Sequence, residues 1–324
     1  MHDPRTRVEE RLAQHTWGAL SSQGCVMGLD VGSYGLRAAL VDLQHHTYTC
    51  LQRDITSKEP SAMMSEVIAL GQQLLSEKHV PDGHLVRIGV GFNGPVDARA
   101  GKIIQSPRVA GWEDYPIADQ VEEAFGAAAL IDNDANLIAL AEATFGVGQG
   151  KRDLFYLHLS SGVGGGLVLN GKLYHGAATM AGEIGHAVVG PFDPLRPDHM
   201  PRTLEEQVSI RGLMARATEL GQSTNLLSDI FTDSVIGRQV VSETIDILAV
   251  RLSQIVALID PEMIILGGIV ARSGGQPFIN GIQERMADFM RSLVERPVPV
   301  VHSVLGFESV AIGGVALVLE SLTE

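Results

Sequence analysis

Apolar and polar positions alternate with two different periods along the first third of the chain. Two short apolar segments, residues 26–30 and 35–43, are separated by a Gly-Ser-Tyr-Gly turn, which predicts a β-hairpin. Residues 62–79 have helical spacing, and residues 86–92 form another apolar strand that ends in Asn-Gly-Pro. This order of strands and helix predicts an α/β domain.

The pattern restarts in the second half of the chain. The polar run IDNDAN, residues 131–136, lies between an apolar strand and an alanine-rich helix that extends to Phe145. A strand at residues 154–159 and a glycine-rich segment at residues 160–166 follow, and later come a long amphipathic helix and a buried-type strand at residues 263–266. A second α/β domain accounts for this order.

The length of 324 residues favours two domains with a cleft between them, because single cores usually stop growing before this size. We expect an N-terminal domain over residues 24–132, completed by a C-terminal helix at 308–324, and a C-terminal domain over residues 133–307. The small residues of the last helix suit close packing. Residues 1–23 offer few apolar anchors and are predicted to be a dispensable appendage.

Composition excludes several classes of partner. The net charge of −14 repels nucleic acids and acidic membranes. A small anionic ligand remains possible where backbone amides or a metal ion create a locally positive potential. Cys25 and Cys50 are too few for a disulfide framework and do not match metal-ligand spacing. The chain start lacks an apolar signal region, and no run of about 18 apolar residues occurs. We therefore expect a soluble cytoplasmic protein.

Three glycine-containing turns each follow an apolar strand. Glycines there let backbone amides approach an anion closely, and hydroxyls add donors. Each turn taken alone is better explained as a tight β-turn, whereas three at strand ends also suit a phosphate site; none matches a P-loop or a full dinucleotide fingerprint. Asp30 directly precedes the first turn, where a carboxylate can hold Mg²⁺ through water or cap its own turn. The three turns contain Gly32 and Ser33, then Ser161 and Gly162, then Gly267 and Gly268.

Two further sets of polar residues could contact a polyol. Glu183 and His186 lie three residues apart, so one helical turn would place both on one face, where they could bind vicinal hydroxyls or form a surface pair. Asp134 follows a strand end and could accept a proton from an attacking hydroxyl. The alternative for Asp134 is an N-cap, for which Asn133 and Asn136 are also suited.

Taken together, these segments resemble the ROK family of bacterial sugar kinases and sugar-responsive repressors, within the actin-like ATPase superfold. The resemblance runs from about residue 26 to the C-terminus and rests on five motifs in the same order and spacing. It implies an α/β fold of two actin-like, ribonuclease H-like ATPase domains with a cleft between them. The five motifs are residues 91–97, 106–112, 131–136, 161–186 and 260–268.

The resemblance also implies roles for individual residues. Asp134 matches the general base, and the matching sugar ligands are Gly94, Asn133, Glu183, His186 and Glu205. The nucleotide side matches Asp30, Gly32, Ser33, Ser161, Gly162, Gly267 and Gly268. The implied activity is transfer of the ATP γ-phosphate to a hydroxyl of a hexose or amino sugar, with ATP and Mg²⁺ as cofactors. We expect a homo-oligomer, a dimer, with no nucleic-acid or membrane partner.

Three positions depart from the family pattern. Where its sugar kinases usually have Gly-Gly-Thr-Lys, this chain has Gly-Ser-Tyr-Gly, with Tyr34 and Gly35 in place of the last two. The zinc site that members often build from His186 lacks its three cysteines, since Arg196, Asp198 and Thr203 stand there, so no structural zinc is expected. Arg108 replaces an Asn and could select a different or anionic sugar, or be solvated.

A non-catalytic or degenerate sugar sensor is the alternative function. The repressors of this family keep the sugar site but carry a winged helix-turn-helix before it. Residues 1–23 are too short for such a domain, and the charge of −14 opposes DNA binding. An actin-like structural ATPase, a third possibility, would explain the phosphate turns but leave the sugar-binding set without a role.

Overall fold

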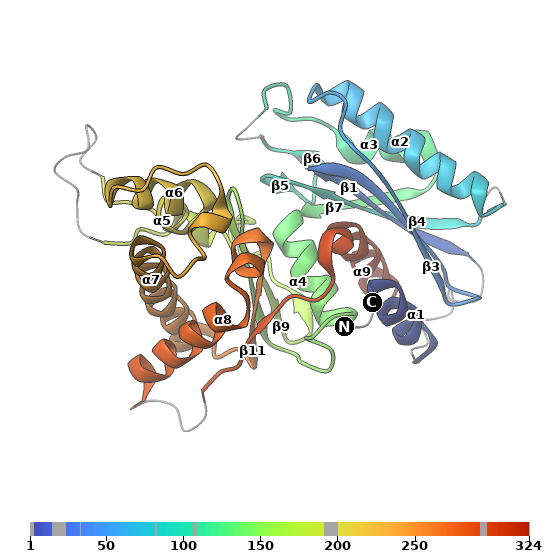
Figure 1. The fold of residues 1–324 in the computed structure, drawn as a ribbon. Coiled ribbons are helices and arrows are strands. Elements are labelled where there is room, and N and C mark those ends of the chain that lie inside the picture. Colours follow the sequence, from blue (N-terminus) through green and yellow to red (C-terminus); the bar gives the residue numbers. More distant parts are fainter. Residues whose placement is uncertain are drawn as a thin grey trace. The chain divides into compact units, whose positions relative to one another are not determined.

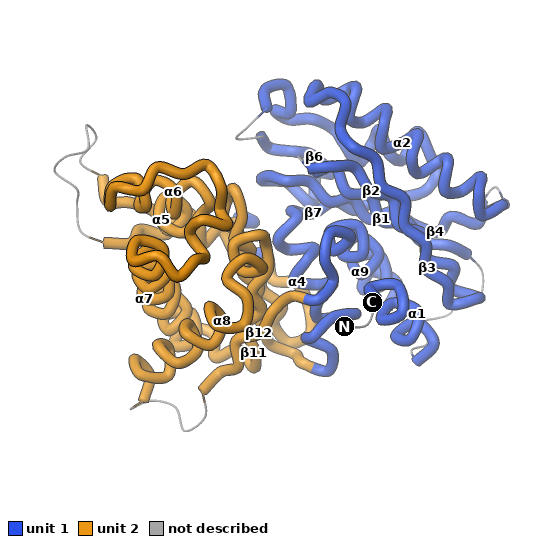
Figure 2. Tube along the Cα trace, viewed as in Figure 1, with its two compact units in different colours: residues 1–150, 175–179, 304–324 blue, residues 151–174, 180–303 orange. Residues whose placement is uncertain are grey.

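The computed structural model describes residues 3–14, 24–32, 34–81, 83–105, 109–190, 200–291 and 297–323 (Figure 1). Contacts divide the chain into two compact units (Figure 2). Unit 1 comprises residues 1–150, 175–179 and 304–324, and unit 2 comprises residues 151–174 and 180–303.

Unit 1 is built on a five-stranded mixed sheet with the order β3-β2-β1-β4-β7. β2 is antiparallel to β1 and β3, while β1, β4 and β7 are parallel. The predicted hairpin and the predicted first helix are both confirmed. The elements are α1 (Pro4–Gln14), β1 (Cys25–Gly32), β2 (Gly35–Asp42), β3 (Thr47–Arg53), α2 (Pro60–Glu77), β4 (Leu85–Phe92), β5 (Val96–Asp97), β6 (Lys102–Ile103), α3 (Ile117–Phe125), β7 (Ala128–Asn133), α4 (Asp134–Thr144), η4 (Gly306–Glu308) and α9 (Ser309–Thr323).

Helix α9 lies directly on the sheet of unit 1, against β1 and β4. A Cβ atom added at Gly28 would overlap the backbone of Ala311, and one added at Gly89 would overlap the backbone of Gly314. Two strand glycines therefore form notches that admit the helix backbone, as the small residues of this helix predicted. Within the described residues, the stretch Gly306–Thr323 is long and apolar enough to cross a membrane by length and composition, and burial against this sheet accounts for its apolarity.

The N-terminal helix α1 is integrated into unit 1. Val8 and Leu12 are both 0% exposed and belong to a core cluster that also contains residues of β2 and α9. The Glu9 carboxylate accepts a hydrogen bond from the backbone N–H of Tyr48 in β3 at 3.1 Å. The expectation of a dispensable appendage is therefore corrected over residues 4–14, because two apolar side chains at helical spacing are enough to anchor three turns.

Unit 2 repeats the architecture of unit 1. Its sheet has the order β10-β9-β8-β11-β12, in which β9 is antiparallel to β8 and β10 while β8, β11 and β12 are parallel. The predicted strands and long helix of this half are present. The elements are β8 (Leu154–Leu159), β9 (Val163–Leu169), β10 (Lys172–Leu173), η2 (Ile184–His186), α5 (Leu204–Val208), α6 (Ile210–Glu219), η3 (Leu227–Asp229), α7 (Val235–Ile259), β11 (Met263–Gly267), α8 (Gly268–Met290) and β12 (Val300–His302).

Contacts place the chain's crossing between the units after Gly150 instead of after Asp132. The reason is α4, which packs on α9 inside unit 1. A Cβ added at Gly313 of α9 would overlap the backbone of Leu137 in α4, so the two helices approach at backbone distance. The IDNDAN run thus joins a strand and a helix of the same unit.

Candidate active site

The IDNDAN run forms the turn between β7 and α4 in unit 1. Asn133 is the N-cap of α4, and its Oδ1 accepts a hydrogen bond from the backbone N–H of Ala135 at 2.9 Å. The capping role therefore falls to Asn133. Asp134 is the first residue of the helix, is partly exposed, and accepts from the same N–H through Oδ1 at 2.8 Å. Its Oδ2 is left to face other partners.

The end of the neighbouring strand β4 supplies those partners. Because Phe92 of β4 pairs with Asn133 of β7 in parallel register, the residues after both strands meet at one edge of the sheet. The side-chain amide of Asn93 donates to Asp134 Oδ2, and the amide of Asn133 donates to the carbonyl oxygen of Gly94 at 3.0 Å. Gly94, Asn133 and Asp134 are thus brought together, with Asn93 as a further member.

Asp30 lies at the end of β1, buried to 4% exposure, and pairs with Arg37 across the hairpin. Arg37 Nη1 donates to Asp30 Oδ2 at 2.8 Å. Burial raises the pKa of Asp30 to about 7 although Arg37 lowers it, and Asp134 adds a small increase. The ion pair occupies Oδ2, and no described residue contacts Oδ1 through a hydrogen bond. The metal-side role of Asp30 remains a prediction.

The first of the predicted phosphate turns follows Asp30 directly. A Cβ at Gly32 would lie 2.8 Å from Asp30 Oδ1, so a side chain there would displace the buried carboxylate. Gly35 has φ +136°, a conformation that residues with a side chain rarely adopt. Ser33 and Arg108 lie outside the described residues.

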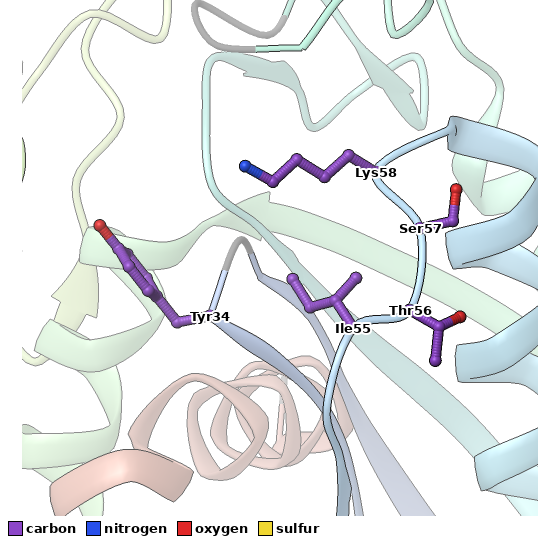
Figure 3. A pocket seen from close by; sticks show the side chains of 5 residues that line it. All are labelled: Tyr34, Ile55, Thr56, Ser57 and Lys58. Atoms are coloured by element: carbon purple, nitrogen blue, oxygen red, sulfur yellow. The ribbon is translucent and has the colours of Figure 1, made fainter.

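Tyr34 lines one side of a shallow cavity of about 330 Å³ (Figure 3). Its side chain is 69% exposed. The segment that follows β3 supplies the other wall, and the ammonium of Lys58 extends across the opening from that wall. The wall residues are Ile55, Thr56, Ser57 and Lys58. The tyrosine is therefore held at the rim of the turn, outside the core.

In unit 2 the glycine-rich turn connects β8 and β9 and contains Ser161 and Gly162. Ser160 N–H donates to the carbonyl of Gly162 at 2.9 Å, which closes the turn. Glu205, in the first turn of α5, accepts from the backbone N–H of Val163 at 3.0 Å. One carboxylate of the predicted sugar set therefore lies at the start of β9, directly after the predicted phosphate turn.

The GEIGH segment lies against β9. A Cβ at Gly182 would overlap Gly165, and one at Gly185 would overlap Val163, so the segment follows the strand backbone closely. Glu183 and His186 occupy one 3-10 turn, as their spacing predicted, with His186 Nε2 3.8 Å from Glu183 Oε2. Within unit 2, Glu205 and the backbone of the GEIGH segment thus both contact the first residues of β9.

Helix α8 begins at the third predicted turn. Gly268 has φ +87°, and a Cβ there would overlap the carbonyl of Leu159 at the end of β8, so the N-terminus of α8 approaches the Ser161 turn. Gly267 is the N-cap and has no side chain to occupy the terminal N–H groups. Open N–H groups and the helix dipole favour an anion. Ser161, Gly162, Gly267 and Gly268 are therefore brought together in unit 2.

The described residues contain no group of three or more His, Cys, Asp and Glu side chains that could hold a metal ion. At the positions of the zinc cysteines, Arg196 and Asp198 lie outside the described residues. Thr203, at the third, is the N-cap of α5, where it forms a capping box with Glu206. The Thr203 side chain thus stabilises the N-terminus of α5.

Three polar residues of unit 1 were not predicted from the sequence to belong to the site. Asn93 lies in the motif of residues 91–97 but was given no role there, although it contacts Asp134. Arg37 could have been found from hairpin register, which pairs it with Asp30. His175 contacts Asp132 at 2.6 Å across 43 positions, and no local pattern indicates that pair.

The two repeated sheets and the polar turns define an actin-like ATPase fold of the sugar-kinase type. Residues 26–321 match the ROK family, and the chain belongs to that family. A glucokinase of Halalkalibacterium halodurans is 30% identical over 270 residues, covering 76% of this chain and 81% of that protein. The bifunctional enzyme NanE/NanK of Brucella melitensis is 30% identical over 293 residues, covering 89% of this chain and 52% of that protein.

Among solved structures, the ROK hexokinase from Thermus thermophilus superposes with a TM-score of 0.81 at 27% identity, covering 92% of this chain and 99% of that one. The α/β fold class and the family resemblance are thereby confirmed. The roles of the individual site residues remain predictions.

Proposed function

We propose that this protein is an ATP-dependent sugar kinase that transfers the γ-phosphate to a hydroxyl of a hexose or amino sugar. The observation that carries the proposal is the Asp134 carboxylate, which is oriented at the N-terminus of α4 by Asn93 and by the helix backbone. An ionised carboxylate has about four lone-pair sites, so two accepted bonds leave room for a substrate proton. Asp134 would take the proton from the attacking hydroxyl.

The sugar would be held by further residues that the family resemblance assigns. The Asn133 side chain donates one hydrogen bond to the carbonyl of Gly94 and accepts one from the N–H of Ala135, which leaves one N–H and one lone pair for a hydroxyl. Glu183, His186 and Glu205 of unit 2 would supply the remaining contacts. The relatives named glucokinase and NanE/NanK support a hexose or an N-acylated amino sugar as the substrate class.

The nucleotide phosphates would bind to unit 2. The N-terminus of α8 at Gly268 has no side-chain cap and lies near the turn of Ser161 and Gly162, so backbone N–H groups of both could bind phosphate oxygens. Phosphoryl transfer requires mainly positioning and charge neutralisation. A divalent cation bound with ATP would contribute to the charge neutralisation, and Asp30 would lie on the metal side through its Oδ1, since Arg37 occupies Oδ2. We further propose a cytoplasmic dimer that carries no structural zinc.

The test is a coupled ADP-release assay over a panel of hexoses and amino sugars, with wild type and Asp134→Asn. The amide keeps the shape of the side chain but cannot act as the base, so turnover should fall by about two orders of magnitude or more while sugar binding weakens only modestly. Asp119→Asn in α3 is a matched control, since Asp119 is an exposed carboxylate in the first turn of another helix of unit 1. Turnover of Asp134→Asn near that of wild type would refute the proposed base.

The nucleotide assignment is tested separately by calorimetry with ATP and Mg²⁺. Ser161→Ala/Gly162→Val removes a hydroxyl and crowds the turn, so the affinity for ATP should fall while that for the sugar is retained. Equal ATP affinity of the double variant and wild type would place the phosphates elsewhere.

A sugar-binding sensor without turnover is the second candidate. The Asp30–Arg37 ion pair and the exposed Tyr34 favour it, because both alter the first phosphate turn. For a sensor, the assay would show sugar binding with no ADP release in wild type, and Asp134→Asn would change affinity alone, by about 0.5 to 3 kcal/mol.

A further inference from the structure

His175 and Asp132 of unit 1 form a hydrogen-bonded pair next to the turn that carries Asp134. His175 Nε2 lies 2.6 Å from Asp132 Oδ2, and an ionised carboxylate can only accept, so Nε2 carries the proton. The carboxyl group of Asp132 is 1% exposed, whereas His175 is about one-third exposed. A buried carboxylate of this kind needs a partner to stay charged.

The second oxygen of Asp132 binds the beginning of α4. Asp132 Oδ1 accepts from the backbone N–H of Asn133 at 2.7 Å and from the side-chain amide of Asn136 at 2.9 Å. One carboxylate thus joins the histidine to the turn that carries the candidate base. Asp134 follows two residues later, so its orientation depends on the same turn.

We propose that His175 is a positioning residue for this reaction, which holds and charge-balances Asp132 so that the α4 turn keeps Asp134 oriented for proton transfer. The kinetic part of this inference rests on the proposed kinase function. Loss of the imidazole would leave the buried Asp132 carboxylate without this partner, and the carboxylate would rotate. That rotation would release the N–H of Asn133 and let the turn relax.

The charges around His175 support a cationic partner for Asp132. Asp132 of β7 raises the pKa of His175 through its hydrogen bond, and Glu320 of α9 raises it further. Burial and Arg99 lower it, and the net direction is upward. His175 is therefore charged over a wider pH range than a free histidine.

The experiment compares His175→Ala, His175→Gln and a control in steady-state kinetics. His175→Ala should lower kcat by about 10- to 100-fold, the scale of a lost charge-assisted hydrogen bond, with the KM for sugar within about threefold of wild type. His175→Gln keeps a donor and should recover part of that loss. The matched control is His45→Gln, since His45 also lies 2.6 Å from an aspartate, Asp42, but is exposed on a turn.

A readout without turnover is amide hydrogen exchange at Asn133 and Ala135. Both amides should exchange at least about tenfold faster in His175→Ala than in wild type and in His45→Gln, because the turn loses its support. A wild type without ADP release would defeat the kinase proposal, while this exchange would still decide the positioning role. Unchanged amide exchange in folded His175→Ala, or a kcat of that variant equal to wild type, would overturn the inference. If His175→Ala does not fold, His175→Gln replaces it. Unchanged kcat and unchanged exchange of His175→Gln at every pH between about 6 and 9 would then overturn the inference.

Discussion

Replacing Glu142 with glutamine is expected to lower the free energy of unfolding by about 3 to 5 kcal/mol. Glu142 lies in α4 and is 0% exposed. Its Oε1 accepts from the backbone N–H groups of Val304 at 2.8 Å and Leu305 at 3.2 Å, and its Oε2 accepts from that of Val147 at 3.0 Å. The chain first leaves unit 1 shortly after Val147 and re-enters it for the last time at Val304, so one carboxylate binds the backbone beside the first and the last of these crossings.

The magnitude follows from counting acceptors. Glutamine has only one side-chain oxygen, and the orientation that loses fewer hydrogen bonds directs this oxygen toward Val304 and Leu305. These two bonds are then made to a neutral oxygen instead of a charged one, which costs about 1 kcal/mol each. The amide nitrogen then faces the N–H of Val147, which leaves a buried donor unsatisfied at about 1 to 3 kcal/mol. The total is a large part of the roughly 5 to 15 kcal/mol that stabilises a typical domain.

Urea unfolding measures this change through the midpoint and the m-value. The matched control is Glu122→Gln in α3, where an exposed glutamate accepts a single backbone hydrogen bond, from Ala129 at 2.9 Å. The control should stay within about 0.5 kcal/mol of wild type. A Glu142→Gln variant no less stable than the control would refute the reasoning, since it would show that the buried bonds carry no net stability.

Four further outcomes are expected. Gly89→Ala should destabilise by about 3 kcal/mol or more in the same assay, because the added Cβ meets the backbone of α9, and a smaller loss would mean that the helix can shift freely. Leu12→Ala should cost about 2 to 5 kcal/mol, in contrast to the exposed Gln14→Ala, and equal stability of the two would restore the appendage reading. Because the pKa of His175 is raised, wild type should be more stable than His175→Gln, and the difference should be largest below about pH 6.5. This difference in stability should disappear as the pH rises through the folded-state pKa of His175, and a pH-independent difference would count against the charged pair. Elemental analysis should find no stoichiometric zinc, and one tightly held zinc per chain would contradict this.

Periodicity predicted the elements that lie near the sheets, because strands and helices of a core carry their apolar residues at period 2 or 3.6. The turn at Asp134 was predictable for the same reason, since a polar run between an apolar strand and a helix places itself at a sheet edge. The close packing of α9 was foreseeable from its small residues, although the notches at Gly28 and Gly89 that receive it were not.

What the sequence could not reveal depends on contacts between distant positions. The pair of His175 with Asp132, and that of Tyr48 with Glu9, have no local signature, because each joins segments about forty residues apart in the chain. The burial of α1 was underestimated since two apolar residues looked insufficient for docking. The ion pair of Asp30 with Arg37 was not predicted either, because the register that brings Arg37 beside Asp30 is set by the length of the hairpin turn.

The position of α9 in the chain bears on how the protein is made. This helix covers the sheet of unit 1, yet it follows every other element of that unit and all of unit 2 in the order of synthesis. While the ribosome adds residues 151–303, the sheet of β1 and β4 exists without the helix that fills its glycine notches, and its apolar face is open to other nascent or folded chains. Unit 2 can therefore complete its fold first, although domains usually fold from the N-terminus onward.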